Sequence, residues 1–244
     1  MKTFFKLLLL LALVVYLGFA FLYFPHQVKD TVCSSVKLAI ADSTQAGFIS
    51  EKEVNHLLKT AHLYPLGQMM DSISSTRIEQ YLEKNPFIKE VVCYKSPGGR
   101  INIVISQRVP VIRIIANNGE DYYIDEDGFS MKPGKYMTNL VVATGNIDNN
   151  FTKKHLIPIG RHIKESDFWN SQIEQIHVTE DQKLEIVPRV GNQIIYLGTP
   201  THLEKKLGNL ELFYKKVMPT VGWNKYSQIN LEFENQIICT KNKN

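Results

Sequence analysis

An apolar run near the amino terminus limits how this chain can fold more than any other feature. Residues 7–24 read LLLLLALVVYLGFAFLYF, 18 residues without a charge or a proline. That length is about the minimum for a helix that crosses a hydrocarbon core of roughly 30 Å. The sequence therefore predicts a transmembrane helix over residues 7–24.

The charges beside this run predict its orientation. Lys2 and Lys6 precede the run, whereas Lys29 beyond it is offset by Asp30. By the positive-inside rule, residues 1–6 then form a cytoplasmic tail and the remainder of the chain is exported.

A cleaved signal peptide is the alternative interpretation of the same run. Signal peptides have an apolar region of about 7–15 residues, followed by a cleavage site of small residues. Here the run is longer, and the bulky residues 21–24 follow the small Ala20. A retained anchor is favoured, and the signal peptide stays open as the second interpretation.

Composition narrows the class of protein. With 244 residues, 44% of them apolar and 21% charged, the chain has room for one large globular domain or two small ones. The net charge of +4 is small and the basic residues are scattered, which argues against a nucleic-acid partner. Cys33, Cys93 and Cys239 are too few and too far apart for a disulfide framework, so we expect free thiols or at most one bridge.

Residues 33–107 show the pattern of a small strand–helix–helix–strand–strand module. Strands are expected at residues 36–40, 88–95 and 101–105, with a turn at 96–99. Capping boxes at Ser50 and Thr76 predict the starts of the two helices. Two helices can cover one face of a three-stranded sheet and bury its isoleucines.

Residues 108–244 are richer in strands. Short strands are expected at 111–115, 121–124, 140–144, 184–187, 194–197, 228–233 and 236–240, with a turn at Glu234-Asn235 before the last one. One helix is expected from Asp167, with Trp169, Ile173 and Ile176 on one face, and a second from a Thr201 capping box. The second helix carries an apolar stripe made of Leu203, Leu207, Leu210, Tyr214 and Val217. The fold class is therefore α+β: a transmembrane helix, a small β-α-α-β-β module, and a β-rich domain with two covering helices.

Local signatures of catalysis do not occur in the sequence. Asp125-Glu-Asp-Gly128 has its glycine too early for a calcium loop and reads as a hairpin turn. The seven histidines form no metal-binding pair, and there is no nucleophile elbow and no phosphate loop. We therefore predict no catalytic residue, no metal, no cofactor and no small-molecule substrate. A β-rich enzyme, anchored or secreted, that acts on envelope polymers remains the alternative.

Several motifs occur in an order that resembles a known family. They are Phe48-Ile-Ser-Glu-Lys-Glu-Val54, the segment 85–91 (NPFIKEV), Gln107-Arg-Val-Pro-Val111, Tyr123-Ile-Asp-Glu-Asp-Gly128, Leu140-Val-Val-Ala-Thr-Gly145 and the terminal segment 226–241. In this order they are similar to the bacterial FtsQ/DivIB family, with its POTRA module over residues 25–107 and its β domain over 108–244. The chain departs from the family pattern where Gln107 replaces a glutamate, Val141 replaces a proline and Glu232 replaces an arginine.

The resemblance implies a role without catalysis. It implies a single-pass protein of the cytoplasmic (inner) membrane at the division septum, with its bulk in the periplasm. It further implies FtsB-like and FtsL-like membrane proteins and other divisome proteins as partners, and help in regulating septal peptidoglycan synthesis. Outer-membrane assembly factors also carry POTRA modules, but no run of amphipathic barrel strands follows here.

The last two strands are the expected partner site. If Ile229, Leu231 and Phe233 face the core, Asn230 and Glu232 face outward. If the strand 236–240 is the last strand of the sheet, its free edge could accept a strand from a partner. The predicted partner-binding residues are Glu232, Phe233, Asn235, Gln236, Ile237, Ile238, Cys239 and Thr240. As an alternative, Ile237, Ile238 and Cys239 are simply core residues or lie under the helix that begins near Leu203.

Overall fold

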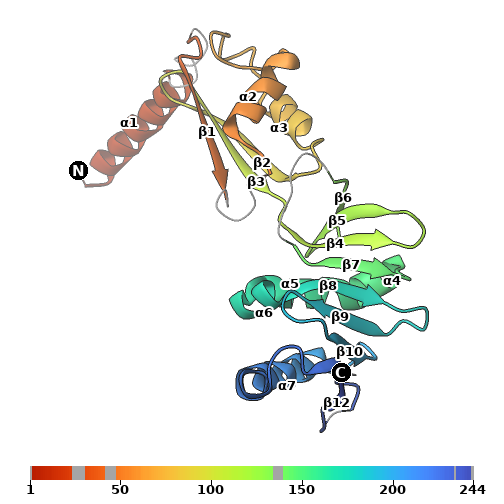
Figure 1. Ribbon diagram of the computed structural model, residues 1–244. Coiled ribbons are helices and arrows are strands. Elements are labelled where there is room, and N and C mark those ends of the chain that lie inside the picture. The colour runs from red at the N-terminus through yellow and green to blue at the C-terminus, as the bar shows by residue number, and fades with distance from the viewer. Residues whose placement is uncertain (1, 24–30, 42–47, 134–139, 234, 243–244) are drawn as a thin grey trace. The chain divides into compact units, whose positions relative to one another are not determined.

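The computed structural model describes residues 2–23, 31–41, 48–133, 140–233 and 235–242. The end of the predicted span at Phe24 and Glu234 of the last predicted turn lie outside these residues. The chain divides into two compact units, Met1–Arg108 and Val109–Asn244, each with its own sheet (Figure 1).

The amino-terminal run is a single helix, α1, which spans Lys2–Tyr23. It begins before residue 7, inside the stretch expected to form the cytoplasmic tail. The part from Phe4 to Leu22 is long and apolar enough to cross a membrane.

Unit 1 contains the small module that the sequence predicts. Its elements are β1 (Ser35–Ala41), α2 (Glu51–Thr60), α3 (Ser75–Leu82), β2 (Ile88–Ser96) and β3 (Arg100–Gln107). The strands lie in the order β1-β3-β2, with β1 parallel and β2 antiparallel to β3. The isoleucines of β3 are fully buried, as are Val54 and Leu58 of α2 and Ile78 and Leu82 of α3. The predicted module and its buried isoleucine face are confirmed.

One of the two predicted capping boxes in unit 1 is wrong. Ser50 caps α2 as expected, because its hydroxyl accepts a hydrogen bond from Glu53 N at 3.3 Å. The cap of α3 is Ser74 instead of Thr76, since the Ser74 hydroxyl accepts from Arg77 N. Glu79, expected to complete a box with Thr76, accepts a hydrogen bond from Cys93 N at 2.7 Å and so ties α3 to β2.

Unit 2 is built on a nine-stranded sheet. Its strands are β4 (Pro110–Ala116), β5 (Asp121–Asp125), β6 (Ser130–Met131), β7 (Val142–Gly145), β8 (Ile173–Val178), β9 (Leu184–Pro188), β10 (Ile194–Gly198), β11 (Tyr226–Asn230) and β12 (Ile238–Lys241). They lie in the order β12-β11-β10-β9-β8-β7-β4-β5-β6, so β12 and β6 are the two edges of the sheet. The pairs β10–β11, β7–β8 and β4–β7 are parallel, and the remaining pairs are antiparallel.

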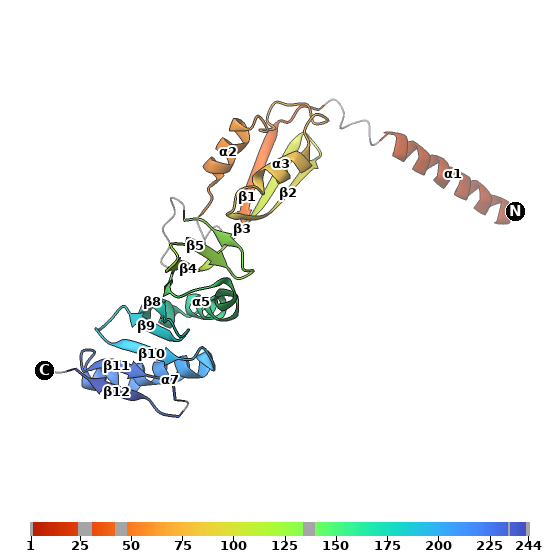
Figure 2. The ribbon, with the colours of Figure 1, turned by 90° about the vertical axis from the view of Figure 1, so that its right-hand side faces the viewer.

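Helices cover one face of this sheet. They are α4 (Asn149–Phe151), the π-helical turn η2 (Thr152–Leu156), α5 (Ile157–Glu165), α6 (Asp167–Gln172), α7 (Leu203–Lys216) and α8 (Met218–Val221). Their apolar side chains form one core with alternate residues of the strands, for example Leu210 of α7 with Ile195 and Ile229. Figure 2 shows α5 and α7 on the same side of the strands. The α+β class with a β-rich second domain is confirmed, with more helices than the two expected.

Two segments of unit 2 differ from the sequence-based expectation. The predicted helix around Trp169 ends at Gln172, and Ile173 and Ile176 lie in the central strand β8. Their spacing fits a helix face, but β-branched residues between two strands bury equally well in a sheet. The helical segment from Asn149 to Glu165 was not expected, since Pro158 and Gly160 interrupt its helical pattern.

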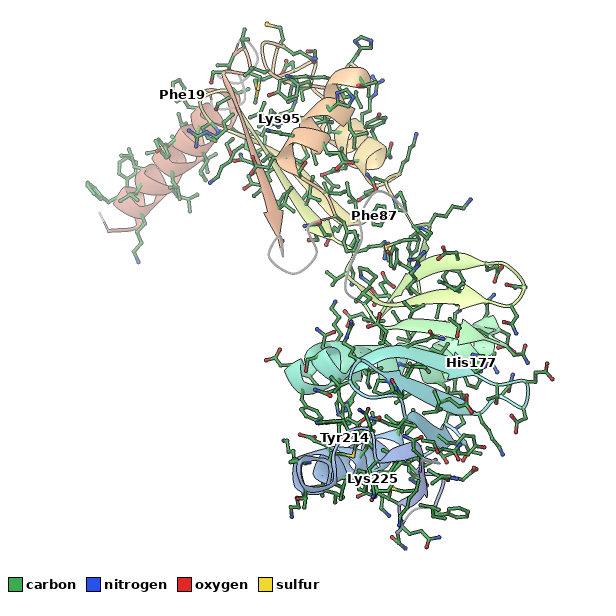
Figure 3. All side chains as sticks on the ribbon, in the orientation of Figure 1. Phe19, Phe87, Lys95, His177, Tyr214 and Lys225 are labelled. Carbon is green, nitrogen blue, oxygen red and sulfur yellow. The ribbon has the colours of Figure 1, made fainter. Side chains whose placement is uncertain are left out.

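The helix α7 begins differently from its prediction. Thr201 does not cap it: the residue before the helix is His202, with φ of +52° and no side-chain cap. The apolar stripe is confirmed, because Leu207, Leu210 and Tyr214 are buried and Leu203 packs against the same core (Figure 3 labels Tyr214).

Candidate partner-binding edge

The carboxyl-terminal strands β11 and β12 form one end of the unit 2 sheet. β11 pairs with β10 in parallel and with β12 in antiparallel orientation, so β11 is a central strand and β12 is the edge. No strand among the described residues pairs with β12 on its other side. β12 begins at Ile238, two residues later than expected, and β11 ends at Asn230, before the predicted Phe233.

The backbone groups of β12 alternate between the two sides. Asn242 N, directly after β12, donates to Lys225 O at 3.1 Å (Figure 3 labels Lys225). Successive residues of a strand point their backbone N–H and C=O groups in opposite directions. The backbone groups of Thr240 and Ile238 therefore face β11, as Asn242 N does. The N–H and C=O groups of Cys239 and Lys241 therefore face away from the sheet.

The side chains of this segment divide between the two faces of the sheet. Ile237 and Cys239 are half-buried and pack against the core on the helix side. Ile238 is 45% exposed on the opposite face, and Thr240 is exposed there as well. The alternative that these residues belong to the core is therefore right in part for Ile237 and Cys239. It is wrong for Ile238, which is exposed.

The expectation that Phe233 faces the core is wrong. Ile229 and Leu231 are buried, but Phe233 is 51% exposed. Leu231 N still donates to Tyr196 O at 2.8 Å, whereas Glu232 N donates to the side-chain oxygen of Asn230. The chain leaves the sheet at this point, so the strand alternation that would bury Phe233 no longer applies.

A groove runs beside β12 on the helix side. Its volume is about 540 Å³, and it lies between α7 and the segment 235–237. Its walls are Leu212, Phe213, Val217, Lys205, Asn209, Lys216, Asn235, Gln236 and Ile237. The three residues from the predicted site, Asn235, Gln236 and Ile237, thus share one hollow with the outer side of α7.

Glu232 lies apart from this groove. Its carboxylate covers Gly198 so closely that a Cβ at Gly198 would meet Glu232 Cδ at 2.6 Å. It also contributes to a cluster around Lys183, whose pKa is raised by a hydrogen bond with Tyr196, by Asp181 and by the charge of Glu232. Glu232 is therefore engaged within the molecule, on the sheet side away from the helices.

The residues at this edge can contact a partner but show little chemical reactivity. Burial raises the pKa of the Cys239 thiol, so the thiol stays protonated near neutral pH. Cys33 and Cys93 are free and buried. Within the described part of the chain, His, Cys, Asp and Glu side chains form no group of three that could hold a metal ion.

Comparison with protein-family models decides which family this architecture represents. Residues 109–240, more than half of the chain, match the model described as FtsQ/DivIB, C-terminal related. The chain belongs to the FtsQ/DivIB family. Residues 31–106 match a POTRA-like domain, which corresponds to the β-α-α-β-β module of unit 1. No curated protein matches the chain.

Membership of the FtsQ/DivIB family confirms the resemblance found in the sequence. FtsQ/DivIB proteins are non-enzymatic proteins of cell division, so this chain has a role in division. Its apolar α1 helix and its family together indicate a single-pass membrane protein.

Sequence reasoning missed the α7 side of the candidate site. Leu212, Phe213 and Lys216 line the groove, but only the buried stripe of this helix stood out in the sequence. Leu212 falls outside that stripe and is 54% exposed. An apolar residue on the outer side of an otherwise regular amphipathic helix was the available signal.

Proposed function

We propose that this FtsQ/DivIB protein is a non-enzymatic scaffold of the divisome that binds an FtsB-like partner by strand addition to β12. In this proposal α1 holds the chain in the cytoplasmic membrane, with residues 1–6 in the cytoplasm and residues 25–244 in the periplasm. Residues 25–107 form the POTRA module, and residues 108–244 carry the partner site. Through FtsB-like and FtsL-like proteins the scaffold helps to regulate septal peptidoglycan synthesis.

The observation that carries the proposal is the open edge of β12. An exposed edge strand is normally guarded by charges, prolines or a covering segment. β12 has one charged residue, Lys241 at its end, and begins with the exposed Ile238. The outward backbone groups of Cys239 and Lys241 can bind a partner strand, whose bonds would supply affinity without a catalytic group.

The groove beside the edge supports selectivity for a partner segment. Side chains of an added strand alternate between the two sheet faces. Those on the helix side would reach the apolar wall of Leu212, Phe213 and Ile237, with Lys216 at the same hollow. Those on the other side would meet Ile238 and Thr240.

The test removes one outward backbone donor and keeps the side-chain size. Cys239→Pro lacks the outward N–H, and proline is tolerated where an edge strand faces solvent. Cys239→Val keeps the N–H and serves as the matched control. We expect Cys239→Pro to weaken binding of the exported segment of an FtsB-like protein about tenfold or more, the effect of losing about 1.4 kcal/mol. Equal affinities of the two variants, measured with the full-length protein in detergent, would place the partner elsewhere.

A further inference from the structure

The end of unit 1 at which the chain arrives from α1 has an unusual surface. We call it the linker end and define it by three segments, residues 31–34, 65–70 and 97–99. Their sequences are TVCS, PLGQMM and PGG, without a single charged side chain. Charged residues make up 21% of the chain, but none of them falls within these 13 residues.

Backbone hydrogen bonds join the three segments of the linker end into one surface. Cys33 N donates to Gln68 O at 2.8 Å, and Gly67 N donates back to Cys33 O at 2.9 Å. Ser34 N donates to Gly99 O at 2.8 Å. Gly99 lies so close to Val32 O that a Cβ there would approach it to 2.5 Å, so the turn and the first segment are in direct contact.

Apolar side chains stand out from this surface. Val32 is 46% exposed, Leu66 49% and Met69 46%, and Val32 and Met69 face each other across an isolated β-bridge. These three side chains thus extend into the surroundings from one hydrogen-bonded platform. Exposed apolar side chains that gather in this way mark a contact with a partner or a membrane.

The length of the chain between α1 and this surface identifies the neighbour. The apolar part of α1, Phe4–Leu22, is 19 residues long, which gives a helix about as long as the hydrocarbon core is thick. Eight residues, 24–31, separate α1 from Val32. A fully extended chain of that length spans at most roughly 30 Å. The linker end is therefore tethered close to the membrane surface, whichever side of the membrane it is on.

We propose that the linker end of unit 1 rests on the lipid surface, with Val32, Leu66 and Met69 inserted between the headgroups. The residues that flank the three segments fit this position. Lys95 and Arg100 border the turn 97–99, and the Lys95 ammonium donates to Met70 O, whereas Asp71 is the acidic neighbour. Tyr64, whose ring lies 5.0 Å from the Lys59 ammonium, precedes the exposed loop and adds an aromatic side chain of the kind enriched at membrane interfaces.

The inference goes beyond partner binding at β12 and needs only that α1 lies in a bilayer. Lipid contact at three points would restrict the tilt of the POTRA-like module on its anchor. It would also keep the module close to the membrane, because the apolar side chains gain the favourable free energy of leaving water.

The test places a fluorophore on the surface itself. The full-length chain carrying Leu66→Trp is reconstituted into nanodiscs of phosphatidylethanolamine and phosphatidylglycerol, with and without bromine on the acyl chains. The matched control is Lys84→Trp, an exposed position beyond α3 at the other end of unit 1. Figure 3 labels Lys95 and Phe87 near the two ends of β2, a strand of nine residues that is about 27 Å long. Trp169 and Trp223 contribute the same background to both proteins.

We expect the added quenching of Leu66→Trp by brominated lipid to exceed that of Lys84→Trp about twofold or more, since interfacial side chains lie roughly 5–10 Å inside the headgroup boundary. Met69→Glu in the Leu66→Trp background should reduce this quenching, whereas Val92→Glu, an equally exposed position of the same module, should not. Equal quenching at positions 66 and 84, or no effect of Met69→Glu, would overturn the proposal. Protection of the tryptophan at position 66 from a water-soluble quencher, without quenching by lipid, would also overturn the proposal. It would assign the surface to a protein partner.

Discussion

At the scale of single residues, close backbone contacts explain family motifs whose role the sequence alone did not reveal. Gly145 ends β7 with φ of +109°, and a Cβ there would approach Val178 O to 2.0 Å. The next residue, Asn146, uses the same Val178 carbonyl as its hydrogen-bond acceptor. The glycine of the segment 140–145 is therefore required because the strands β7 and β8 meet backbone to backbone.

Gly145→Ala is predicted to destabilise unit 2 by about 3 kcal/mol or more, because a strained backbone and a steric overlap add up. The control is Gly208→Ala in α7, where a Cβ meets nothing within 4 Å. That change should stabilise the helix by roughly 0.5–1 kcal/mol. Urea unfolding followed by fluorescence of Trp169 and Trp223 measures both, and a Gly145→Ala protein as stable as the parent would refute this reading.

At the scale of elements, α7 supports the candidate edge from behind. Lys206 is 4% exposed, and its ammonium donates to Leu197 O at 2.7 Å and to Thr199 O at 2.8 Å. These carbonyls belong to β10 and the turn after it, next to β11. A buried ammonium thus fixes α7 to the strands that carry β12.

Lys206→Met is predicted to lower the free energy of unfolding by about 1–3 kcal/mol, because two buried carbonyls lose their hydrogen-bond donor. Lys216→Met on the exposed side of the same helix should change it by no more than about 0.5 kcal/mol. Urea titrations of the two variants compare them directly. Similar unfolding midpoints would mean that the Lys206 hydrogen bonds contribute little.

Elements with local signals could be predicted from the sequence, and elements decided by neighbours could not. Alternating isoleucines and the turn at 96–99 identified β2 and β3, and the Ser50 cap identified α2. Ile173 and Ile176 were predicted to lie in a helix because their spacing fits one, but they pair with β7 and β9 as part of a strand. The helix α5 was not predicted because Pro158 and Gly160 interrupt its helical pattern.

The candidate site shows the same limit. The last strand could be predicted from its apolar residues and the turn before it, but its place at the edge of the sheet was an assumption, because sequence order does not determine the order of strands in a sheet. Phe233 was assigned to the core because the alternation continues in the sequence, although the chain leaves the sheet after Leu231. The groove could not be foreseen, since it requires Phe213 of α7 to lie near Ile237, residues that are distant in the chain.

At the scale of the whole molecule, the chain has two compact units, and the first of them contains the apolar helix α1. Family membership and α1 indicate a single-pass membrane protein, and the orientation follows in our proposal from Lys2 and Lys6 on one side of α1. The membrane contact at the linker end and the partner site on β12 then belong to different units, so each can be disabled separately.

Protease added to spheroplasts is predicted to digest residues 25–244, because the positive-inside rule exports them. The full-length protein should float with the inner membrane before digestion, and a cytoplasmic protein serves as the control for lysis. Resistance of residues 25–244 to the protease in intact spheroplasts would indicate the opposite orientation. A mature soluble chain that begins near Phe21 would show that the signal-peptide interpretation was the right one.

Strand addition to β12 can be tested by site-resolved hydrogen exchange of the β12 amides. On saturation of the full-length protein with the exported segment of an FtsB-like protein, the amides of Cys239 and Lys241 should exchange at least about tenfold more slowly, because they gain acceptors. The amides of Ile238 and Thr240, which already face β11, should change far less. Unchanged exchange at Cys239 and Lys241 under saturating partner would rule out strand addition to β12.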